Sequence, residues 1–259
     1  MRKIVMLVLL GCGLAATCFA ESEYYVKKGA ERLPKPLRKL NGSGIKALGE
    51  QRYGDAAKIY SEFIRKAPKM ALGYANRGTA YMHLEQYDKA SSDYEKAVTL
   101  DPSMREIADP SAPLVRLGME SIDKGDMPAA ERQFLKAVGK NPGNATAWNE
   151  LAFLSAQKRD YAGCIERASK ALKIDPRYAQ ALANRGACYS GVGEFAKALK
   201  DLDESISIEP KAETFMTRGG VNAALKRCPA AKGDVSKAVE MQPGLGDMAG
   251  QLLGACAGR

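Results

Sequence analysis

Prolines recur through most of this 259-residue chain at intervals close to 34 residues. The intervals are 34, 40, 34, 34 and 33 residues, and the prolines are Pro68, Pro102, Pro142, Pro176, Pro210 and Pro243. Repetition at a fixed period of about 20 to 50 residues indicates stacked supersecondary units, because one such unit cannot bury its apolar face alone. Proline lacks an amide hydrogen and restricts the residue before it, so each of these prolines is predicted to end a helix.

Small side chains follow the same period, 24, 12 and 5 residues before the prolines. The first set is Gly44, Gly78, Gly118, Ala152, Gly186 and Gly219; the second is Ala56, Ala90, Ala130, Cys164, Ala198 and Ala231. The third set is Ala or Ser except at Phe63. Two antiparallel helices approach this closely only where small residues face one another. Each period is therefore predicted to be a tightly packed helix pair, with Tyr60, Tyr94, Phe134 and Leu202 filling the space beside the crossing.

Three segments resemble the first helix of the tetratricopeptide repeat, a helix-turn-helix unit of about 34 residues. They are 75–81 (Ala-Asn-Arg-Gly-Thr-Ala-Tyr), 148–152 (Trp-Asn-Glu-Leu-Ala) and 183–189 (Ala-Asn-Arg-Gly-Ala-Cys-Tyr). The resemblance covers about residues 37–243 and implies an all-α, right-handed superhelical solenoid of about six repeats. The repeats are expected at about 37–70, 71–104, 111–144, 145–178, 179–211 and 212–243, followed by a capping helix at 244–259.

The first twenty residues have the pattern of a secretory signal peptide. Arg2 and Lys3 precede a short apolar run, and small residues stand before Glu21. Residues 1–20 are therefore expected to be removed on export, and 21–36 to form an N-terminal linker. The expected location is the periplasm or the outer membrane. A second interpretation stays open, because Leu9-Leu10-Gly11-Cys12 resembles the bacterial lipobox; Cys12 would then carry a lipid that anchors the chain to a membrane.

The formal charge of +9 becomes +7 once Arg2 and Lys3 leave with the signal peptide. The basic residues are mostly scattered and interleaved with acids, which indicates a solvated helical surface and no nucleic-acid partner. The acids on which this interpretation rests are Glu62, Glu85, Asp93, Glu131, Glu166, Asp201 and Glu204. The sequence leaves the oligomeric state open.

Four cysteines remain after removal of the signal peptide, and an even number in an exported chain permits disulfides. In the repeat arrangement, Cys164 begins one second helix and Cys188 lies near the end of the first helix that follows it. Cys228 begins the last second helix, and Cys256 ends the capping helix that runs back along it. These placements predict the pairs Cys164–Cys188 and Cys228–Cys256. The alternative is that Cys164 is a small buried residue where other repeats have alanine.

The sequence shows no set of residues typical of catalysis. It contains one histidine, His83, and no Cys-x-x-Cys or Cys/His cluster with metal-ligand spacing. No Ser/His/Asp set and no phosphate-binding glycine loop is present, since Gly42 to Gly44 and Gly191 to Gly193 fall within the repeat pattern. We therefore predict no enzyme activity, no cofactor and no metal.

The resemblance implies that first helices line a concave wall. The positions that miss the helix crossing in the second to fourth repeats are Leu72, Ala75, Met82, His83, Val115, Met119, Ile122, Asn149, Phe153 and Gln157. This set is apolar and contains methionine, which suits a groove that binds an amphipathic or extended protein segment. The alternative is that these residues pack between helices.

The charged carboxylate clamp of some tetratricopeptide domains is not expected. Asn76 and Arg116 suit two of its places, but Asn41, Ile45 and Ala112 stand where the clamp needs Lys, Asn and Lys. The predicted function is a scaffold or assembly factor of the bacterial cell envelope that binds another protein or peptide. A non-catalytic accessory subunit of an envelope polysaccharide or peptidoglycan enzyme is the alternative.

Overall fold

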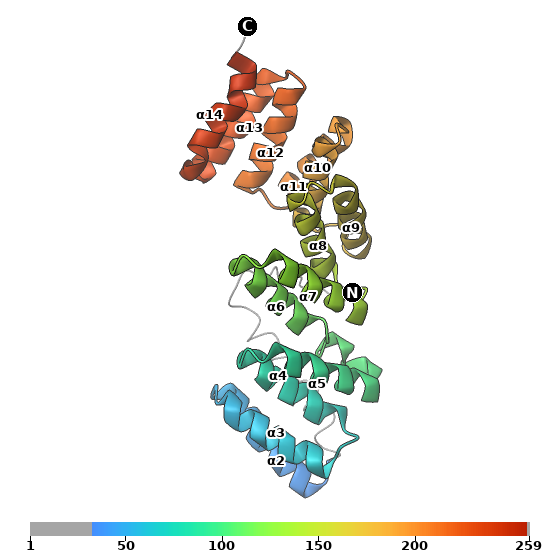
Figure 1. The fold of residues 1–259 in the computed structure, drawn as a ribbon. Coiled ribbons are helices and arrows are strands. Elements are labelled where there is room, and N and C mark those ends of the chain that lie inside the picture. Colours follow the sequence, from blue (N-terminus) through green and yellow to red (C-terminus); the bar gives the residue numbers. More distant parts are fainter. Residues whose placement is uncertain (1–32, 258–259) are drawn as a thin grey trace, which may run out of the picture. The chain divides into compact units, whose positions relative to one another are not determined.

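The computed structural model describes residues 33–257 (Figure 1). The predicted signal peptide, Cys12 and most of the predicted linker at 21–36 lie outside the described residues. Within 33–257 every regular element is a helix. No helix in this described range has the length and apolar character needed to cross a membrane.

The helices follow one another in pairs and form two compact units, an N-terminal unit that ends at Leu117 and a C-terminal unit that begins at Gly118. The N-terminal unit holds α2 (Lys35–Gly49), α3 (Tyr53–Lys66), α4 (Ala71–His83), α5 (Tyr87–Leu100), the 3-10 helix η1 (Pro102–Glu106) and the start of α6 (Ala112–Asp123). The C-terminal unit holds the rest of α6, α7 (Met127–Lys140), α8 (Ala145–Gln157), α9 (Tyr161–Ile174), α10 (Ala179–Gly191), α11 (Phe195–Ile208), α12 (Ala212–Ala224), α13 (Cys228–Met241), η2 (Pro243–Leu245) and α14 (Gly246–Ala257).

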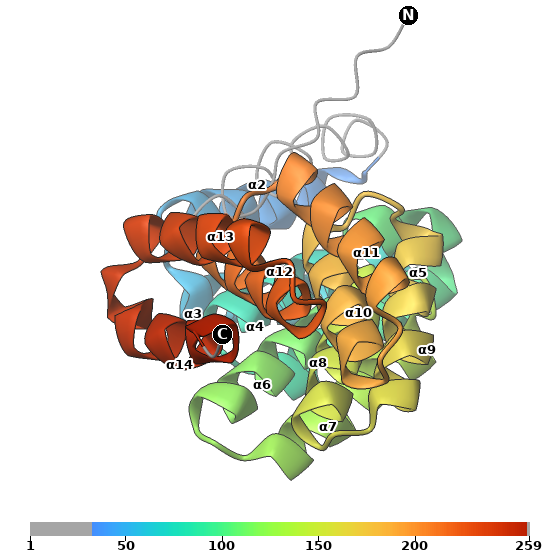
Figure 2. The same cartoon turned by 90° about the horizontal axis from the view of Figure 1, so that it is seen from above.

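Each unit repeats one packing scheme. A first helix packs on its own second helix, as in α4 on α5 or α8 on α9, and that second helix packs on the first helix that follows, as in α9 on α10. The last helix, α14, contacts both α12 and α13, and the views in Figure 1 and Figure 2 agree on this placement. The apolar residues that join α14 to the array include Ala249, Leu252 and Met216.

The turn inside each helix pair contains one residue in the left-handed region. These residues are Gln51, Glu85, Gly125, Arg159, Gly193 and Lys226, with φ between 57° and 80°. A positive φ is strained for residues with a side chain, so the tight turn is retained by the packing of the two helices rather than by glycine alone.

Glycines at the helix crossings are in direct contact with large side chains of the second helix. A Cβ atom built on Gly44 would lie 2.5 Å from the ring of Tyr60, and the same distance separates Gly78 from Tyr94 and Gly118 from Phe134. Such a distance leaves no room for a methyl group. The predicted role of the small residues at the crossing is confirmed at these positions.

Phe63, the one large residue in the third small set, is accommodated by a change on the neighbouring helix. Phe63 is fully buried, and a Cβ atom on Gly73 of α4 would lie 2.7 Å from its ring. The aromatic ring therefore occupies space that a side chain at position 73 would otherwise fill. The exception in the pattern is compensated across the helix interface.

Three arginines of first helices form ion pairs with aspartates of second helices sixteen residues later. The pairs are Arg77–Asp93 at 2.7 Å, Arg185–Asp201 at 2.6 Å and Arg218–Asp234 at 2.5 Å. Asp93 is 6% exposed and Asp201 4% exposed. Their expected placement on a solvated surface is therefore wrong, because each carboxylate turns inward to accept hydrogen bonds from its arginine.

Glycine substitutions at two helical positions are expected to change stability in opposite directions. In Gly186→Ala, the new Cβ would lie 2.8 Å from Leu202 Cγ and 3.1 Å from the Ala198 carbonyl oxygen, neither of which is a flexible side-chain end. Overpacking of about 1–3 kcal/mol should exceed the helix-propensity gain of about 1 kcal/mol, so the free energy of unfolding falls. In Gly233→Ala nothing lies within 4 Å of the Cβ, and stability should rise by about 0.5–1 kcal/mol. Urea denaturation measures the free energy of unfolding of both variants. A change in the same direction in both would contradict the role given to the contacts of Gly186.

Candidate functional site

The predicted groove residues divide between the two units. Leu72, Ala75, Met82, His83 and Val115 belong to the N-terminal unit; Met119, Ile122, Asn149, Phe153 and Gln157 belong to the C-terminal unit. Leu72, Met82, Met119, Ile122 and Phe153 are half-buried, whereas His83 and Gln157 are exposed.

Three of the predicted groove residues are not available as expected. Ala75 is 4% exposed and packs in a cluster with Tyr94 and Val98. Val115 is 7% exposed, in the first turn of α6, where the preceding segment is tied to α5 by a hydrogen bond from Ser91 Oγ to the Pro110 carbonyl oxygen. Asn149 is 1% exposed because its side chain bonds to the next first helix. Their assignment to an open wall is therefore corrected to packing between helices.

His83 has an aromatic neighbour that the sequence did not indicate. Its imidazole stacks on the Tyr53 ring, with the ring centroids 4.3 Å apart. Partial burial lowers the pKa of His83, which favours the neutral ring at neutral pH. In the N-terminal unit His83 is thus a packing partner of Tyr53 and not an isolated surface residue.

A chain of side-chain hydrogen bonds through two amide groups links α8 and α10. Asn184 Nδ2 donates to Asn149 Oδ1 at 2.9 Å, and Asn149 Nδ2 donates to Glu150 Oε1 at 3.1 Å. A second asparagine pair with the same separation of 35 residues lies in the N-terminal unit, where Asn76 Nδ2 is 3.5 Å from Asn41 Oδ1. Asn184 and Glu150 were not among the residues predicted from the sequence, although asparagines 35 residues apart are a visible signal.

Glu150 is the unusual member of this group. It is half-buried and forms no ion pair with any of the described residues. Burial raises the pKa of Glu150, and the hydrogen bond from Asn149 only partly opposes this effect. Burial also raises the pKa of Tyr178, with a smaller contribution from the negative charge of Glu150. The structure therefore retains a poorly solvated carboxylate on a first helix.

Glu150→Gln is expected to make the protein more stable at neutral pH. The pKa of Glu150 is higher in the folded state than in the unfolded state, so the folded state binds the proton more tightly. The free energy of unfolding therefore falls as the pH rises from the unfolded pKa through the folded pKa. The melting temperature of Glu150→Gln should exceed that of the wild type at pH 7, and the difference should disappear in acid. Glu166→Gln is the matched control, because a hydrogen bond from Lys170 lowers the pKa of Glu166, and its effect should have the opposite sign. A melting temperature lowered by Glu150→Gln would contradict this account.

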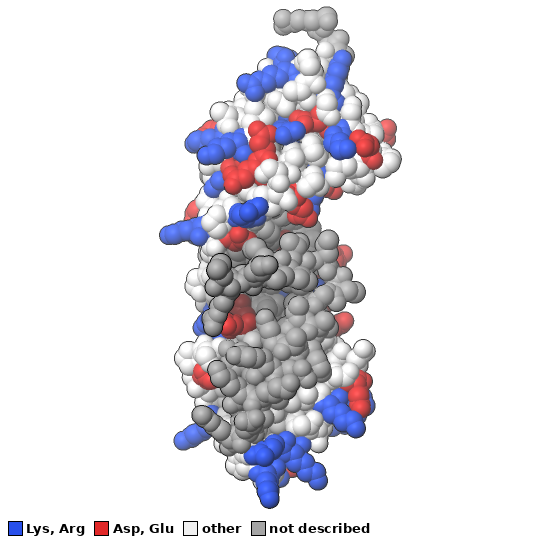
Figure 3. All heavy atoms as spheres, turned by 180° about the vertical axis from the view of Figure 1, so that it is seen from behind, with Lys and Arg blue, Asp and Glu red and all other residues white. Residues whose placement is uncertain are grey.

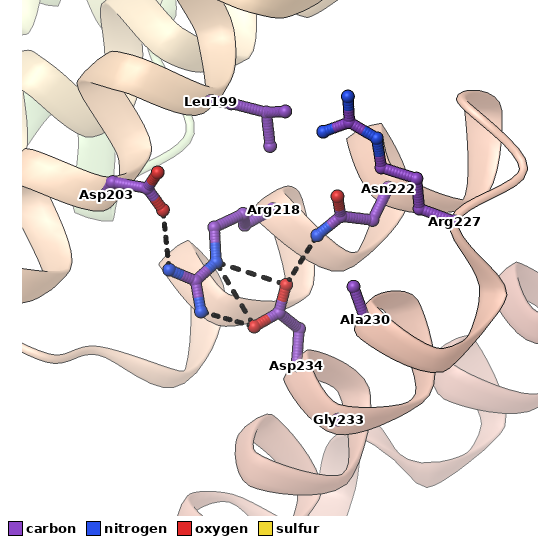
Figure 4. Close-up of a pocket in the computed structure, with 8 residues that line it drawn as sticks. All are labelled: Leu199, Asp203, Arg218, Asn222, Arg227, Ala230, Gly233 and Asp234. Atoms are coloured by element: carbon purple, nitrogen blue, oxygen red, sulfur yellow. Dashed lines mark hydrogen bonds and ion pairs between the residues drawn. The ribbon is translucent and has the colours of Figure 1, made fainter.

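A pocket of about 350 Å³ opens between α11, α12 and α13 (Figure 4). Arg218 lies at its centre and donates hydrogen bonds to Asp234 and, at 2.6 Å, to Asp203. Asn222 Nδ2 donates to Asp234 Oδ2 at 3.0 Å. The negative charges of Asp203 and Asp234 equal in number the positive charges of Arg218 and Arg227 in this pocket. Because its central guanidinium is already bonded to both acids, the pocket is an ion-pair cluster that joins three helices.

Among the described residues the structure has two disulfides, with the pairing that the repeat arrangement predicts. Cys164 of α9 is bonded to Cys188 of α10, with a Cα–Cα distance of 6.3 Å. Cys228 of α13 is bonded to Cys256 of α14, with a Cα–Cα distance of 5.7 Å. Cys164 and Cys188 are fully buried beside Ala152 and Ala168. Ala168 stands where Tyr94 and Phe134 stand in their repeats, so in this repeat the cysteines fill space that an aromatic ring fills elsewhere.

The charges on the surface are mixed in sign. On the face shown in Figure 3, Lys and Arg of the C-terminal part alternate with Asp and Glu. No group of three or more His, Cys, Asp or Glu residues suitable for a metal ion occurs in the part of the chain that the structure describes. The first helices offer apolar side chains, amides and, at Glu150 of α8, a half-buried carboxylate, which suits the binding of a polypeptide.

The repeated helix pairs and these first-helix faces define the class of protein, a helical-repeat scaffold of the protein-binding type. Models of the tetratricopeptide repeat match residues 71–104, 115–179 and 179–211, about half of the chain. The chain belongs to the tetratricopeptide-repeat family. Its fold is an all-α tetratricopeptide solenoid, as the resemblance implied.

Proteins of similar sequence include co-chaperones. The small glutamine-rich tetratricopeptide repeat-containing protein 2 of Saccharomyces cerevisiae is 29% identical over 166 residues, which are 62% of this chain and 44% of that protein. The Hsp70-Hsp90 organizing protein 3 of Arabidopsis thaliana is 24% identical over 70% of this chain and 38% of its own length. This chain thus spans less than half the length of these relatives.

Solved structures agree on the fold. YrrB, described as a TPR protein with an unusual peptide-binding site, has a TM-score of 0.52 and 20% identity over 72% of this chain and 94% of its own. The Cut9 and Hcn1 assembly of APC/C contains a chain with a TM-score of 0.54 and 17% identity, covering 94% of this chain and 47% of that one.

Proposed function

We propose that this protein is an exported scaffold or assembly factor of the bacterial cell envelope that binds a partner segment along its first helices. The observation that carries the binding part is the set of half-buried apolar side chains on α6 and α8, namely Met119, Ile122 and Phe153. Partly exposed methionine and aromatic side chains provide adaptable contact area for a polypeptide.

Two features support the export part of the proposal. Residues 1–20 have the pattern of a secretory signal peptide. The two disulfides suit an oxidising compartment, because disulfides are rare where thiols are kept reduced. Sequencing of the mature N-terminus tests this part. A protein that begins at Glu21 in the periplasmic fraction is expected, and a chain that retains Met1 in the cytoplasm would contradict export.

The organizing proteins among the relatives are named for Hsp70 and Hsp90. An alternative partner is therefore the acidic C-terminal tail of a chaperone. The carboxylate clamp that grips such an acidic tail needs cations on the first and third of three successive first helices. Asn41 and Ala112 stand at two of the required lysine positions. We therefore propose an envelope protein, and not an acidic chaperone terminus, as the partner.

The binding face is tested by removing its apolar contacts. Met119→Ser/Phe153→Ser should abolish capture of the partner from native envelope extracts, while the helical circular dichroism stays unchanged. The matched control is Leu135→Ser/Met241→Ser, which removes two exposed apolar side chains from second helices, 48% and 43% exposed. The control should capture the partner normally. Equal capture by both double variants would contradict binding along the first helices.

Photo-crosslinking locates the partner without a loss of function. A photoreactive residue at Gln157, exposed on α8, should crosslink to the partner, whereas one at Lys136, exposed on the second helix α7, should not. Crosslinks that form only from Lys136 would place the partner on the second helices and contradict binding along the first helices.

A further inference from the structure

Glu150 is a carboxylate that the fold buries without neutralising. Three other buried carboxylates in the C-terminal and N-terminal units each have an arginine, in the pairs Arg77–Asp93, Arg185–Asp201 and Arg218–Asp234. Glu150 has only the amide of Asn149. A carboxylate taken partly out of water is unfavourable unless a cation or several donors compensate for the lost hydration. The fold itself gains nothing from a charge in this place.

One oxygen of Glu150 is available for a ligand. Asn149 Nδ2 donates to Oε1, and no described residue donates to Oε2. Among the described residues, the buried side-chain oxygen left without a partner is Gln133 Oε1. Glu150 Oε2, which has no hydrogen-bond partner either, is therefore not fully buried. The carboxylate is therefore half-buried but reachable from outside.

The two asparagines fix the position of the carboxylate. Asn184 donates to Asn149 Oδ1 at 2.9 Å, which leaves Asn149 Nδ2 to donate to Glu150 at 3.1 Å. Because this orientation of Asn149 makes both hydrogen bonds, its amide is held in place and orients Oε1 of Glu150. A charged group that is oriented before its ligand arrives loses less conformational freedom on binding.

The surroundings of Glu150 favour a positive ligand. The charges felt at the nearby Tyr178 hydroxyl are those of Glu150, Asp175 and Glu209, all negative, and all raise the pKa of Tyr178 together with burial. The basic residue next to Glu209 is Lys211, which pairs with Glu209 at 3.2 Å and contacts Gln180. No cation of the described residues pairs with Glu150 itself.

From this geometry we propose that Glu150, held by Asn149 and Asn184, binds the ammonium or guanidinium group of a Lys or Arg side chain in the partner segment. The inference rests on the proposed function, since it names the chemistry that the first helices recognise in a bound polypeptide. The sign is opposite to that of a carboxylate clamp: here the scaffold supplies the acid and the partner supplies the cation. An apolar part of the same segment contacts Phe153, which follows Glu150 by one helical turn on α8.

Selection from a displayed library of random dodecapeptides tests the proposal on the full-length protein. The wild type should select peptides with Lys or Arg at one fixed position. Glu150→Gln should lose that preference and bind a synthetic copy of a selected peptide about 10- to 100-fold more weakly, the range expected for a hydrogen bond to a charged group. Glu150→Lys should select Asp or Glu at the same position. Glu166→Gln, which removes a charge from the exposed side of α9, should select the same peptides as the wild type.

A double-mutant cycle separates a direct contact from a general charge effect. Replacing the basic residue of the selected peptide by norleucine should weaken binding to the wild type about as much as Glu150→Gln does, and should have little further effect on Glu150→Gln. The melting temperature provides a second readout, because a purely structural glutamate would lose stability when changed to Gln, whereas Glu150 is expected to gain it.

The outcomes distinguish this inference from the proposed function. Selected peptides without a basic position, or a basic preference that survives Glu150→Gln, would overturn the assignment of Glu150 while leaving segment binding intact. Selection of no peptide by any variant would overturn segment binding, and the role of Glu150 with it.

Discussion

Asp201→Ala is expected to lower the free energy of unfolding of the C-terminal unit by about 3–5 kcal/mol, the usual effect of breaking a buried ion pair from one side. The Asp201 side chain is 5% exposed and accepts hydrogen bonds from Arg185 Nε at 2.6 Å and Nη2 at 2.9 Å. Its removal leaves the Arg185 guanidinium, 23% exposed, without its carboxylate. The remaining contacts of Arg185, with Ser169 Oγ and the Tyr189 ring, carry no full negative charge.

Two further variants make this prediction specific. Asp203→Ala changes an aspartate of the same helix that is 60% exposed, and should cost about 1 kcal/mol or less. Arg185→Leu/Asp201→Leu removes both charges and should recover most of the stability, because an apolar pair needs no compensation. Guanidinium denaturation measures all three. A double variant no more stable than Asp201→Ala would show that the loss comes from packing and not from the unpaired arginine.

Phe134→Ala should destabilise the protein by a similar amount, about 3–5 kcal/mol. Phe134 is fully buried in α7, and its ring lies against Gly118 so closely that a Cβ atom there would be 2.5 Å away. Truncation leaves a cavity that the glycine cannot fill. The repeat that contains α10 and α11 meets the same need with Leu202 against Gly186, so Phe134→Leu should retain most of the stability.

The neighbouring residue provides the control for Phe134→Ala. Leu135 is 48% exposed on the same helix, and Leu135→Ala should change the free energy of unfolding by about 0.5 kcal/mol or less. The melting temperatures of the three variants should therefore rise in the order Phe134→Ala, Phe134→Leu, Leu135→Ala. Equal effects at positions 134 and 135 would contradict the packing of the ring on Gly118.

The packing of the helix pairs could be predicted from the sequence, whereas the partners of individual polar side chains could not. Proline spacing and the small residues such as Gly78 and Gly118 report backbone contacts that every helix pair must make, so they predicted the fold. The same pattern also placed Cys164 and Cys188 on facing helices. The ion-pair and hydrogen-bond partners of single side chains depend on distances of a few ångströms. The spacing of the repeats does not determine such distances.

Two kinds of error came from this limit. Asp93 and Asp201 were assigned to the surface because acids usually lie there, yet each has an arginine sixteen residues earlier that holds it inside. Ala75 and Asn149 were assigned to the open wall because they miss the helix crossing, but the neighbouring first helix covers that side. In both cases the decisive contact is made by a residue on another helix.

The disulfide between Cys164 and Cys188 has a mechanical consequence. Helical-repeat arrays deform and unfold by changing the spacing between neighbouring repeats, because each repeat contacts only those next to it. A covalent bond between α9 and α10 prevents that change at one interface, so these two repeats must stretch, twist and open as a single block. Asn149 on α8 and Asn184 on α10 lie on the two sides of this joint, and their amide contact is thereby protected against the breathing motions that loosen other interfaces.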